Sequence, residues 1–522
     1  MDAEKVENDN MHLTEQELFK ITEEMRNEMN DVYKKASQIP EKYIVEEDIP
    51  YNFRTYDQMQ SFFITVTKKG FIEDNHPVIL IDVIIEKLDL TAIYEDYSKE
   101  GNPAYHPRMM IKILFYAYFC KIMSSRTIWQ NVINRCDFLF LAAGQVPDFR
   151  TINNFRKRHL DKLPGIFAQI VLMCKELDMI GFEHLAIDGE KIQANANYTK
   201  SKNLEQIKKE LDRIKHGIKN LLEKEVNEYV AKELIEKRVN TLEKKIAKLE
   251  PLKRTLEQIA DENKRINLTD SDSPVMRFKD GRSRPAYNHQ TARDSKCNVV
   301  TAAETSLSGD KPEDLIPIVD QSIRNSGQHH DKVSADSGFC SYINLEKFED
   351  RPEDFHVPDR RCESSKSETD EGKKFNQEKF LKNEAGDYIC PAGQKMKFVR
   401  TIKTADGSST ANVYECVACW NCIIKGRCTK AAKRQIMIDA REPLKEKMRQ
   451  KLNSEQGREV YMKRQGLIES IHGDDQKNRG WIQHLLRGLK KAKGEFLLIR
   501  IVQNISCIIK HRADEILAWA ES

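Results

Sequence analysis

The sequence contains no long hydrophobic run and too few cysteines to form a disulfide scaffold. No stretch reaches the roughly eighteen apolar residues that a membrane-spanning helix needs, and the most apolar segment, residues 111–120, is too short. The first residues lack both a basic region and an apolar stretch, so we expect no signal peptide. Twelve cysteines in 522 residues favour a cytoplasmic chain whose thiols are mostly reduced.

The sequence also lacks a strong net charge. Its 85 Lys and Arg residues nearly balance 82 Asp and Glu residues, which gives +3. However, residues 1–50 contain 6 basic and 14 acidic residues, whereas residues 430–522 contain 20 basic and 12 acidic residues. A basic C-terminal segment is typical of nucleic-acid binding and equally of a solvated surface. The 39% hydrophobic and 32% charged fractions indicate a soluble globular chain of about two to four domains.

Hydrophobic periodicity predicts a mixed α/β chain. After an acidic segment over residues 1–50, apolar residues at helical spacing predict a helical domain over residues 51–180, and its basic residues make it the candidate DNA-binding domain. Short apolar runs that alternate with amphipathic helices predict an α/β core over residues 181–198 and 266–360. The predicted strands of this core cover residues 183–188, 286–292, 297–306, 332–336 and 355–358.

Three further segments interrupt or follow this core. Leu and Ile residues that recur every three or four positions predict an inserted antiparallel helical hairpin over residues 199–265. Residues 361–440 predict a polar connector and a small β-rich insert that holds five cysteines. Residues 441–522 are predicted to be helical to the end of the chain and to complete the α/β core.

Two acidic residues follow predicted strands. Asp188 precedes Gly189, and Asp336 precedes Ser337 and Gly338, so each acid either begins a turn or marks the functional edge of the sheet. Carboxylates on adjacent strands suit Mg²⁺ or Mn²⁺. Glu469 follows two apolar residues on a predicted helix, so we expect its side chain to point inward as a third ligand. The competing candidates for this third acid are Asp474, Asp475 and Glu495.

Five cysteines lie close together late in the chain. The spacing Cys419-x2-Cys422-x5-Cys428 is typical of a metal-binding turn, and Cys390 is available as a fourth ligand for Zn²⁺. Free thiols are an alternative. An iron–sulfur cluster is another, because Cys416, Cys419 and Cys422 have ferredoxin-like spacing, although a close fourth Cys-Pro is missing.

Basic residues on two helices are candidate DNA contacts. The fourth helix of the N-terminal domain and the helix before it have the order of a helix-turn-helix, although a solvated basic face explains the same pattern. Near the C-terminus, a second basic group is placed to follow phosphates. The candidates are Arg150, Arg156, Lys157 and Arg158 on the fourth helix, and Lys490 and Lys491 near the C-terminus.

A series of short motifs resembles bacterial insertion-sequence transposases of the DDE class. The resemblance covers about residues 50–510, and within that class it is to the group with an N-terminal helical domain, an inserted helical hairpin and a cysteine-containing insert. The motifs are His76-Pro77, Tyr105–Met110, Pro147–Ile152 with Phe155 and Arg156, Ile187–Ile192 with Ala194–Asn197, Ala335–Gly338, Arg464–Glu469, Asn478–Trp481, Leu486–Lys491, Gly494–Phe496 and Asn504.

The resemblance implies a ribonuclease H-like core and a specific activity. Asp188, Asp336 and Glu469 would be the catalytic acids that hold two Mg²⁺ or Mn²⁺ ions, with Tyr461 and Arg464 in support. The substrates would be double-stranded DNA carrying terminal inverted repeats and the target DNA, bound by a homodimer in the cytoplasm at the nucleoid. The resemblance also favours Cys390 over Cys416 as the fourth ligand of a structural Zn²⁺.

Two departures from the family pattern leave an alternative open. Gln476 stands where the family has a Lys, and His472 stands where a Phe is common. A catalytically decayed or domesticated transposase that only binds DNA is therefore the second hypothesis. A structural scaffold built on the helical hairpin is a third hypothesis, but it leaves the strand-end acids unexplained. We find no Ser-His-Asp arrangement that would indicate a hydrolase.

Overall fold

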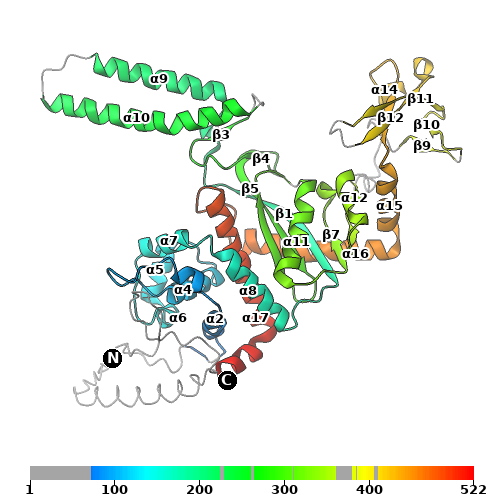
Figure 1. Ribbon diagram of the computed structural model, residues 1–522. Helices are drawn as coiled ribbons and strands as arrows, with labels where there is room; N and C mark the ends of the chain where they lie inside the picture. Colours follow the sequence, from blue (N-terminus) through cyan, green and yellow to red (C-terminus); the bar gives the residue numbers. More distant parts are fainter. Residues whose placement is uncertain are drawn as a thin grey trace, which may run out of the picture. The chain divides into compact units, whose positions relative to one another are not determined.

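The computed structural model describes residues 72–73, 75–223, 229–259, 264–309, 311–359, 375, 379–383, 385–404 and 409–521 (Figure 1). The chain forms two units, one made of Met1–Met179 with Lys490–Ser522 and the other of Ile180–Leu489. The predicted acidic segment over residues 1–50 lies outside the described residues. None of the described helices has the length and apolar character that crossing a bilayer requires.

The first unit is built from helices, as its periodicity predicts. Both His-Pro pairs begin helices, because proline at the first helical position has the backbone angle that a helix needs and no N–H to satisfy. The Nδ1 atom of His76 also accepts the N–H of Val78 at 3.2 Å. The helices are α2 (Pro77–Glu86), α3 (Thr91–Tyr94), α4 (Pro107–Phe119), α5 (Ser125–Asn134), α6 (Cys136–Leu141), α7 (Phe149–Arg158), α8 (Leu163–Glu176) and α17 (Leu489–Glu521).

A buried lysine joins α2 to α4. Lys112 has no exposed surface. Its Nζ lies 2.7 Å from Asp82 Oδ1 and also contacts Glu86. One turn earlier on α4, Arg108 donates to the carbonyl oxygen of Ile85 at 2.6 Å. Because a buried charge is costly without partners, these ion pairs fix how the two helices pack.

The second unit contains a six-stranded mixed sheet. The strand order is β4-β5-β1-β7-β8. β6 pairs with β5 on the side away from β1. β7 and β8 run parallel to β1, whereas β5 is antiparallel to β1, β4 and β6. The strands are β1 (His184–Gln193), β4 (Val275–Arg277), β5 (Ser283–Asp294), β6 (Val300–Ser306), β7 (Lys332–Ser334) and β8 (Asp354–His356).

Alternation along the strands divides the sheet into two faces. Leu185 and Ile187 belong to an apolar core that also contains residues of α11 (Leu315–Ser326), α12 (Tyr342–Glu349) and α15 (Glu442–Asn453). The opposite face of β1 carries Asp188, which contacts α16 (Glu455–Gly473). One strand prediction was wrong at its end: β1 does not stop at Asp188, because pairing with β5 carries it to Gln193.

The helical hairpin and the cysteine insert both form where the sequence pattern predicts. α9 (Leu204–Leu222) and α10 (Tyr229–Gln258) are antiparallel, since Lys208 faces Glu257 at 3.2 Å and Lys215 faces Glu250 at 3.8 Å. The short strands β2 (Ser201–Lys202) and β3 (Ile266–Asn267) pair at the base of the hairpin.

In the cysteine insert, three antiparallel strands pair in the order β11-β12-β13. Most of the predicted connector before it lies outside the described residues. The elements of the insert are β9 (Leu381–Lys382), β10 (Tyr388–Ile389), β11 (Met396–Lys403), β12 (Thr410–Cys416), η6 (Cys419–Asn421), α14 (Lys425–Cys428) and β13 (Gln435–Asp439).

Replacing Lys112 tests the buried ion pairs. We expect Lys112→Ala to lower the free energy of unfolding by about 3 kcal/mol, because Asp82 and Glu86 would lose their buried cation. Urea unfolding followed by circular dichroism measures this change. Lys157→Ala, at an exposed position on α7, is the control and should unfold like the original chain. Equal stability of the two variants would contradict the assigned role.

Candidate functional site

Asp188, within β1, and Asp336, just after β7, lie at the same level of two adjacent parallel strands. The last residue pair between β1 and β7 is Ala186 with Ser334, and each acid follows two residues later. Neighbouring strands lie about 4.8 Å apart, so the two carboxylates begin from neighbouring positions at one edge. Asp336 also begins a turn, because its Oδ1 accepts the N–H of Gly338 at 2.8 Å at the start of η4 (Ser337–Phe339).

Asp188 lies between two basic side chains of α16. Arg464 Nη2 is 3.1 Å from Asp188 Oδ1, and His472 Nε2 is 3.3 Å from Asp188 Oδ2. Arg464 Nε also donates to the carbonyl oxygen of Ile187 at 3.3 Å. Burial alone would raise the pKa of Asp188, but the hydrogen bond from His472 and the charge of Arg464 outweigh it and lower this pKa. Asp188 is therefore a carboxylate at neutral pH.

Glu190 is a second buried acid on the same face of β1, and the sequence analysis missed it. It is 5% exposed, its Oε2 lies 3.1 Å from His472 Nδ1, and its Oε1 accepts a hydrogen bond from Gln476 at 2.5 Å. Gln476 lies on the following helical segment, η7 (Asp474–Asn478). The spacing of two residues from Asp188 was the available signal, because such residues share a face of a strand.

His472 bridges the two carboxylates of β1. Its burial would lower its pKa, but hydrogen bonds with Asp188 and Glu190 and the charges of both acids raise the pKa of His472 to about 9. The ring is therefore a cation at neutral pH. The Phe-to-His and Lys-to-Gln departures from the family pattern thus belong to one network, because His472 and Gln476 both contact Glu190.

The expectation that Glu469 points inward was wrong. Glu469 is exposed, and its Oε1 accepts a hydrogen bond from Gln465 at 2.9 Å. Ile468 and Ile471 take the inward positions on α16, and the helical rotation of about 100° per residue turns Glu469 away from Ile468. Tyr461, expected to support the site, packs against the apolar core beneath the sheet.

The competing acids have other surroundings. Asp474 pairs with Arg479 at 2.7 Å, and Asp475 is fully buried in η7. Glu495 is also fully buried, in the first unit, where its charge acts on Tyr118 and Arg156. Glu495 therefore belongs to the interior of the helical unit.

The acids supply the oxygen ligands that Mg²⁺ prefers, but the structure does not assemble them into a complete metal site. Within the described ranges, no group of three or more His, Cys, Asp or Glu side chains is arranged to hold a metal ion. Asp188 is engaged by Arg464 and His472, and Glu469 faces solvent. Asp188 and Asp336 thus fit as a pair, whereas the third ligand is not in place.

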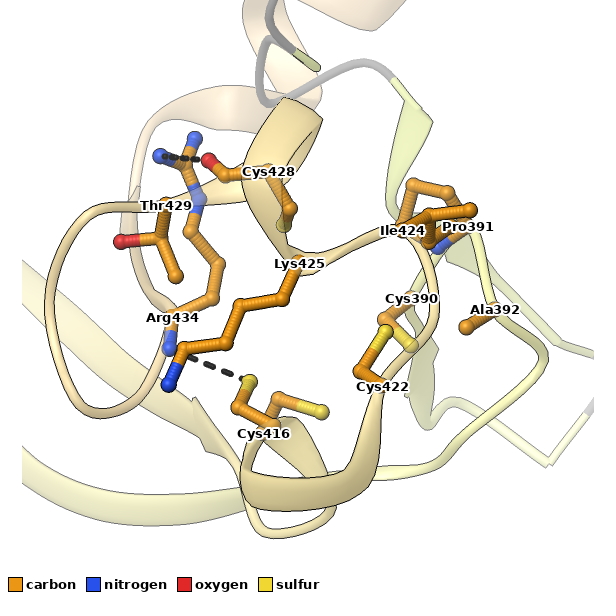
Figure 2. A pocket seen from close by; sticks show the side chains of 11 residues that line it. Cys390, Pro391, Ala392, Cys416, Cys422, Ile424, Lys425, Cys428, Thr429 and Arg434 are labelled. Atoms are coloured by element: carbon orange, nitrogen blue, oxygen red, sulfur yellow. Dashed lines mark hydrogen bonds between the residues drawn. The ribbon is translucent and has the colours of Figure 1, made fainter.

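The five cysteines of the insert line one pocket (Figure 2). Cys390 Sγ accepts the N–H of Gln394, and Cys419 Sγ accepts the N–H of Arg434, each at 3.4 Å. Cys416, which the resemblance left outside the ligand set, lines the same pocket and is buried. Burial raises the pKa of its thiol to about 12, and the adjacent Cys419 and Cys390 add to the increase. All five are free cysteines, so the pocket contains the donor type that Zn²⁺ prefers, but within the part of the chain that the structure describes no three of these thiols are arranged to hold a metal ion.

One of the predicted DNA contacts was wrong. Arg156 is 4% exposed and donates to Tyr118 Oη at 3.0 Å and to the carbonyl oxygen of Met123 at 2.8 Å, so it stabilises the helical unit. Arg158 is exposed, but its guanidinium contacts the carbonyl oxygen of Asp96 and lies over the Tyr97 ring. The remaining exposed candidates are Arg150 and Lys157 on α7 and Lys490 and Lys491 on α17.

The raised pKa of His472 predicts a pH dependence of stability. Because the pKa of His472 rises from 6.5 in the unfolded chain to about 9 in the folded one, its stabilisation is complete below pH 6.5. It is then lost as the pH rises through about 9, by on the order of 2–3 kcal/mol. We expect His472→Phe to flatten the dependence of the unfolding free energy on pH between these values.

Urea unfolding across this pH range measures the effect. The control is His216→Phe, at an exposed position on α9, which should keep the original slope. An unchanged slope in His472→Phe would show that His472 is not held as a cation between the two acids.

Two family models match the chain, and both describe transposases. A family described as Transposase DDE domain matches residues 389–509, a range that includes Glu469 and the five clustered cysteines. A family described as Transposase domain (DUF772) matches residues 66–158 in the helical unit. No curated protein and no solved structure gave a significant match. A DDE domain implies a nuclease or strand-transferring enzyme that binds DNA, so the two matches agree with the motif resemblance and support an insertion-sequence transposase of the DDE class.

Proposed function

We propose that this transposase cuts and joins the DNA ends of its element by metal-assisted phosphoryl transfer at Asp188 and Asp336. The observation that carries the proposal is the register of β1 and β7, which brings two acids far apart in sequence to the same edge of the sheet. A carboxylate pair where the parallel pairing of two strands ends is a suitable place for divalent cations that bind phosphate oxygens.

The sheet topology supports a ribonuclease H-like core. If the five main strands β1, β5, β6, β7 and β8 are numbered in chain order, their spatial order is 3-2-1-4-5, and only the second runs against its neighbours. The first acid lies on the first of these strands, the second acid follows the fourth, and α16 contacts the first strand through Arg464. This is the arrangement that the family resemblance implies.

We assign the third carboxylate to Glu469. It lies three residues before His472 on α16, so the two side chains begin on neighbouring parts of the helix surface. Its present partner, Gln465, is exposed and neutral, so rotation of the Glu469 side chain would not leave a buried charge behind. Bound Mg²⁺ or Mn²⁺ ions would supply Lewis-acid stabilisation of the attacking and leaving oxygens.

Arg464 and His472 have a positioning role in this proposal. Both hold the Asp188 carboxylate from α16, and Arg464 also fixes the backbone of Ile187. In the absence of another cation, they neutralise a group that would otherwise be buried as an unpaired charge. Binding of a metal ion would require Asp188 to exchange at least part of these contacts.

A second candidate function is DNA binding without catalysis. The outward position of Glu469 and the contact between His472 and Asp188 are what a decayed or domesticated copy would show. Both hypotheses use the same DNA-binding chain, so only a cleavage assay separates them. The homodimer and the nucleoid location remain predictions.

Asp188→Asn tests the catalytic assignment. The change keeps the size of the side chain and removes the charge, so strand cleavage should fall by on the order of 1,000-fold or more. Binding of the element end should persist, because phosphate contacts come from basic residues. The assay follows a labelled duplex that carries the inverted repeat flanking the gene, in Mg²⁺ and in EDTA.

Asp212→Asn, at an exposed position on α9, is the matched control and should cleave normally. Full cleavage by Asp188→Asn would refute the catalytic assignment. Failure of the original chain to cut a verified end would favour the decayed copy.

We also propose that the cysteine pocket binds one structural Zn²⁺ through Cys390, Cys419, Cys422 and Cys428. The backbone N–H groups of Gln394 and Arg434 donate to Cys390 Sγ and Cys419 Sγ, and such hydrogen bonds support the proposal because they favour the thiolates that Zn²⁺ requires. Elemental analysis should find one zinc per chain, and Cys428→Ser should lose it. Cys297→Ser, outside the pocket, is the control. Iron in place of zinc would indicate a cluster, and neither metal would leave free thiols.

A further inference from the structure

The cysteine insert exposes an apolar tip, which consists of Val417, Trp420 and Ile423. Trp420 is 82% exposed, Ile423 is fully exposed and Val417 is 51% exposed. Large aromatic side chains are seldom this accessible, and Trp481, for comparison, is 1% exposed. An exposed apolar group of this kind is typical of an interaction surface.

The inward direction of the neighbouring cysteines explains why these side chains face outward. Cys419 and Cys422 line the pocket, and Trp420 lies between them in the short helical turn η6. Ile423 follows Cys422 directly. Because the thiols take the inward positions, the intervening apolar residues project to solvent, and the short spacings between cysteines restrict how far they can move.

The surroundings of the apolar tip are basic. Residues 417–434 contain five Lys and Arg residues and no Asp or Glu, and residues 386–440 contain nine basic and four acidic residues. Three of the five have protein partners: Lys433 pairs with Glu415 at 2.7 Å, Arg434 donates to the carbonyl oxygen of Cys428 at 3.4 Å, and Arg427 lies over the Phe375 ring. Lys430 is exposed, and Lys425 is half-buried at the mouth of the pocket (Figure 2).

We infer that the apolar tip is a DNA contact in which Trp420 stacks on a base at an opened or distorted step while Lys425 and Lys430 contact phosphates. The inference rests on the proposed function, since it requires a chain that acts on DNA. Aromatic side chains stack on unpaired bases, and apolar wedges enter unstacked steps, in each case beside cations that bind the backbone. The charge of the surrounding residues fits a polyanion and would repel a basic protein surface.

The experiment measures binding of the full chain to two fluorescein-labelled 30-bp duplexes in buffer without Mg²⁺ or Mn²⁺ and without a chelator. One is fully paired, and the other carries a central bulge of three unpaired thymines. Trp420→Ala should weaken binding to the bulged duplex by about 5- to 100-fold, and Trp420→Phe should retain most of the affinity because a ring remains. Leu381→Ala removes a 69% exposed apolar residue of the same insert on β9 and should bind normally.

A second variant tests the cations. Changing Lys425 and Lys430 together to Gln should reduce the slope of log affinity against log salt on the fully paired duplex by up to about 2. Circular dichroism and zinc content, compared with the original chain, show whether each variant remains folded.

The outcomes separate this inference from the proposed function. Normal binding of the bulged duplex by Trp420→Ala overturns the inference. The inference is also overturned if Trp420→Ala changes only the sedimentation coefficient of the protein and not its affinity for DNA, because the apolar tip would then be a protein contact. Because binding is measured without Mg²⁺ or Mn²⁺ and does not depend on cleavage, loss of affinity in Trp420→Ala supports the inference even if the original chain fails to cleave. Failure of the original chain to bind any of these duplexes would overturn both proposals.

Discussion

A half-buried carboxylate and a buried one, side by side on one strand, are the constraint on which the candidate site depends. Asp188 and Glu190 share the face of β1 that α16 covers, and neither could remain ionised there without positive partners. Arg464 and His472 supply the charge, and Gln476 completes the hydrogen bonds of Glu190. The position of α16 on the sheet is therefore tied to electrostatic neutralisation as well as to apolar packing.

The same contacts set up a competition between protein cations and metal ions. A group that stabilises the carboxylate in the folded chain occupies the oxygens that a metal would use. A site of this kind is stable without metal and must give up contacts when metal binds, so the affinity for metal reflects the difference between the two arrangements.

Buried charge also organises the rest of the described chain. Lys112 ties α2 to α4, and Arg156 bonds to Tyr118 and Met123 within the helical unit. In the cysteine insert, thiols rather than charges take the interior, and this choice leaves Trp420 and Ile423 outside. In each case, the side chains that must be paired or buried in the interior determine which neighbouring side chains face solvent.

The sequence by itself determined the class of elements and the family. Helical periodicity, strand runs and cysteine spacing are local signals, so the hairpin, the helical unit and the β-rich insert formed where they were predicted. Asp188 and Asp336 could be singled out because each follows an apolar run. The bridging role of His472 and the burial of Glu190 could not be predicted from the sequence. Both depend on how α16 lies across β1, and these segments are almost three hundred residues apart.

Helix rotation and tertiary packing decided the remaining assignments. Arg156 has basic sequence neighbours that suggest an exposed position, but it donates hydrogen bonds to α4 and to the loop after it. Glu469 has apolar sequence neighbours, but its side chain faces solvent. Successive side chains on a helix differ in direction by about 100°. A prediction of the inward face that is wrong by one residue therefore assigns an exposed side chain to the interior, or a buried one to the surface. Only the tertiary structure shows which side of a helix meets its neighbour, because that depends on contacts distant in sequence.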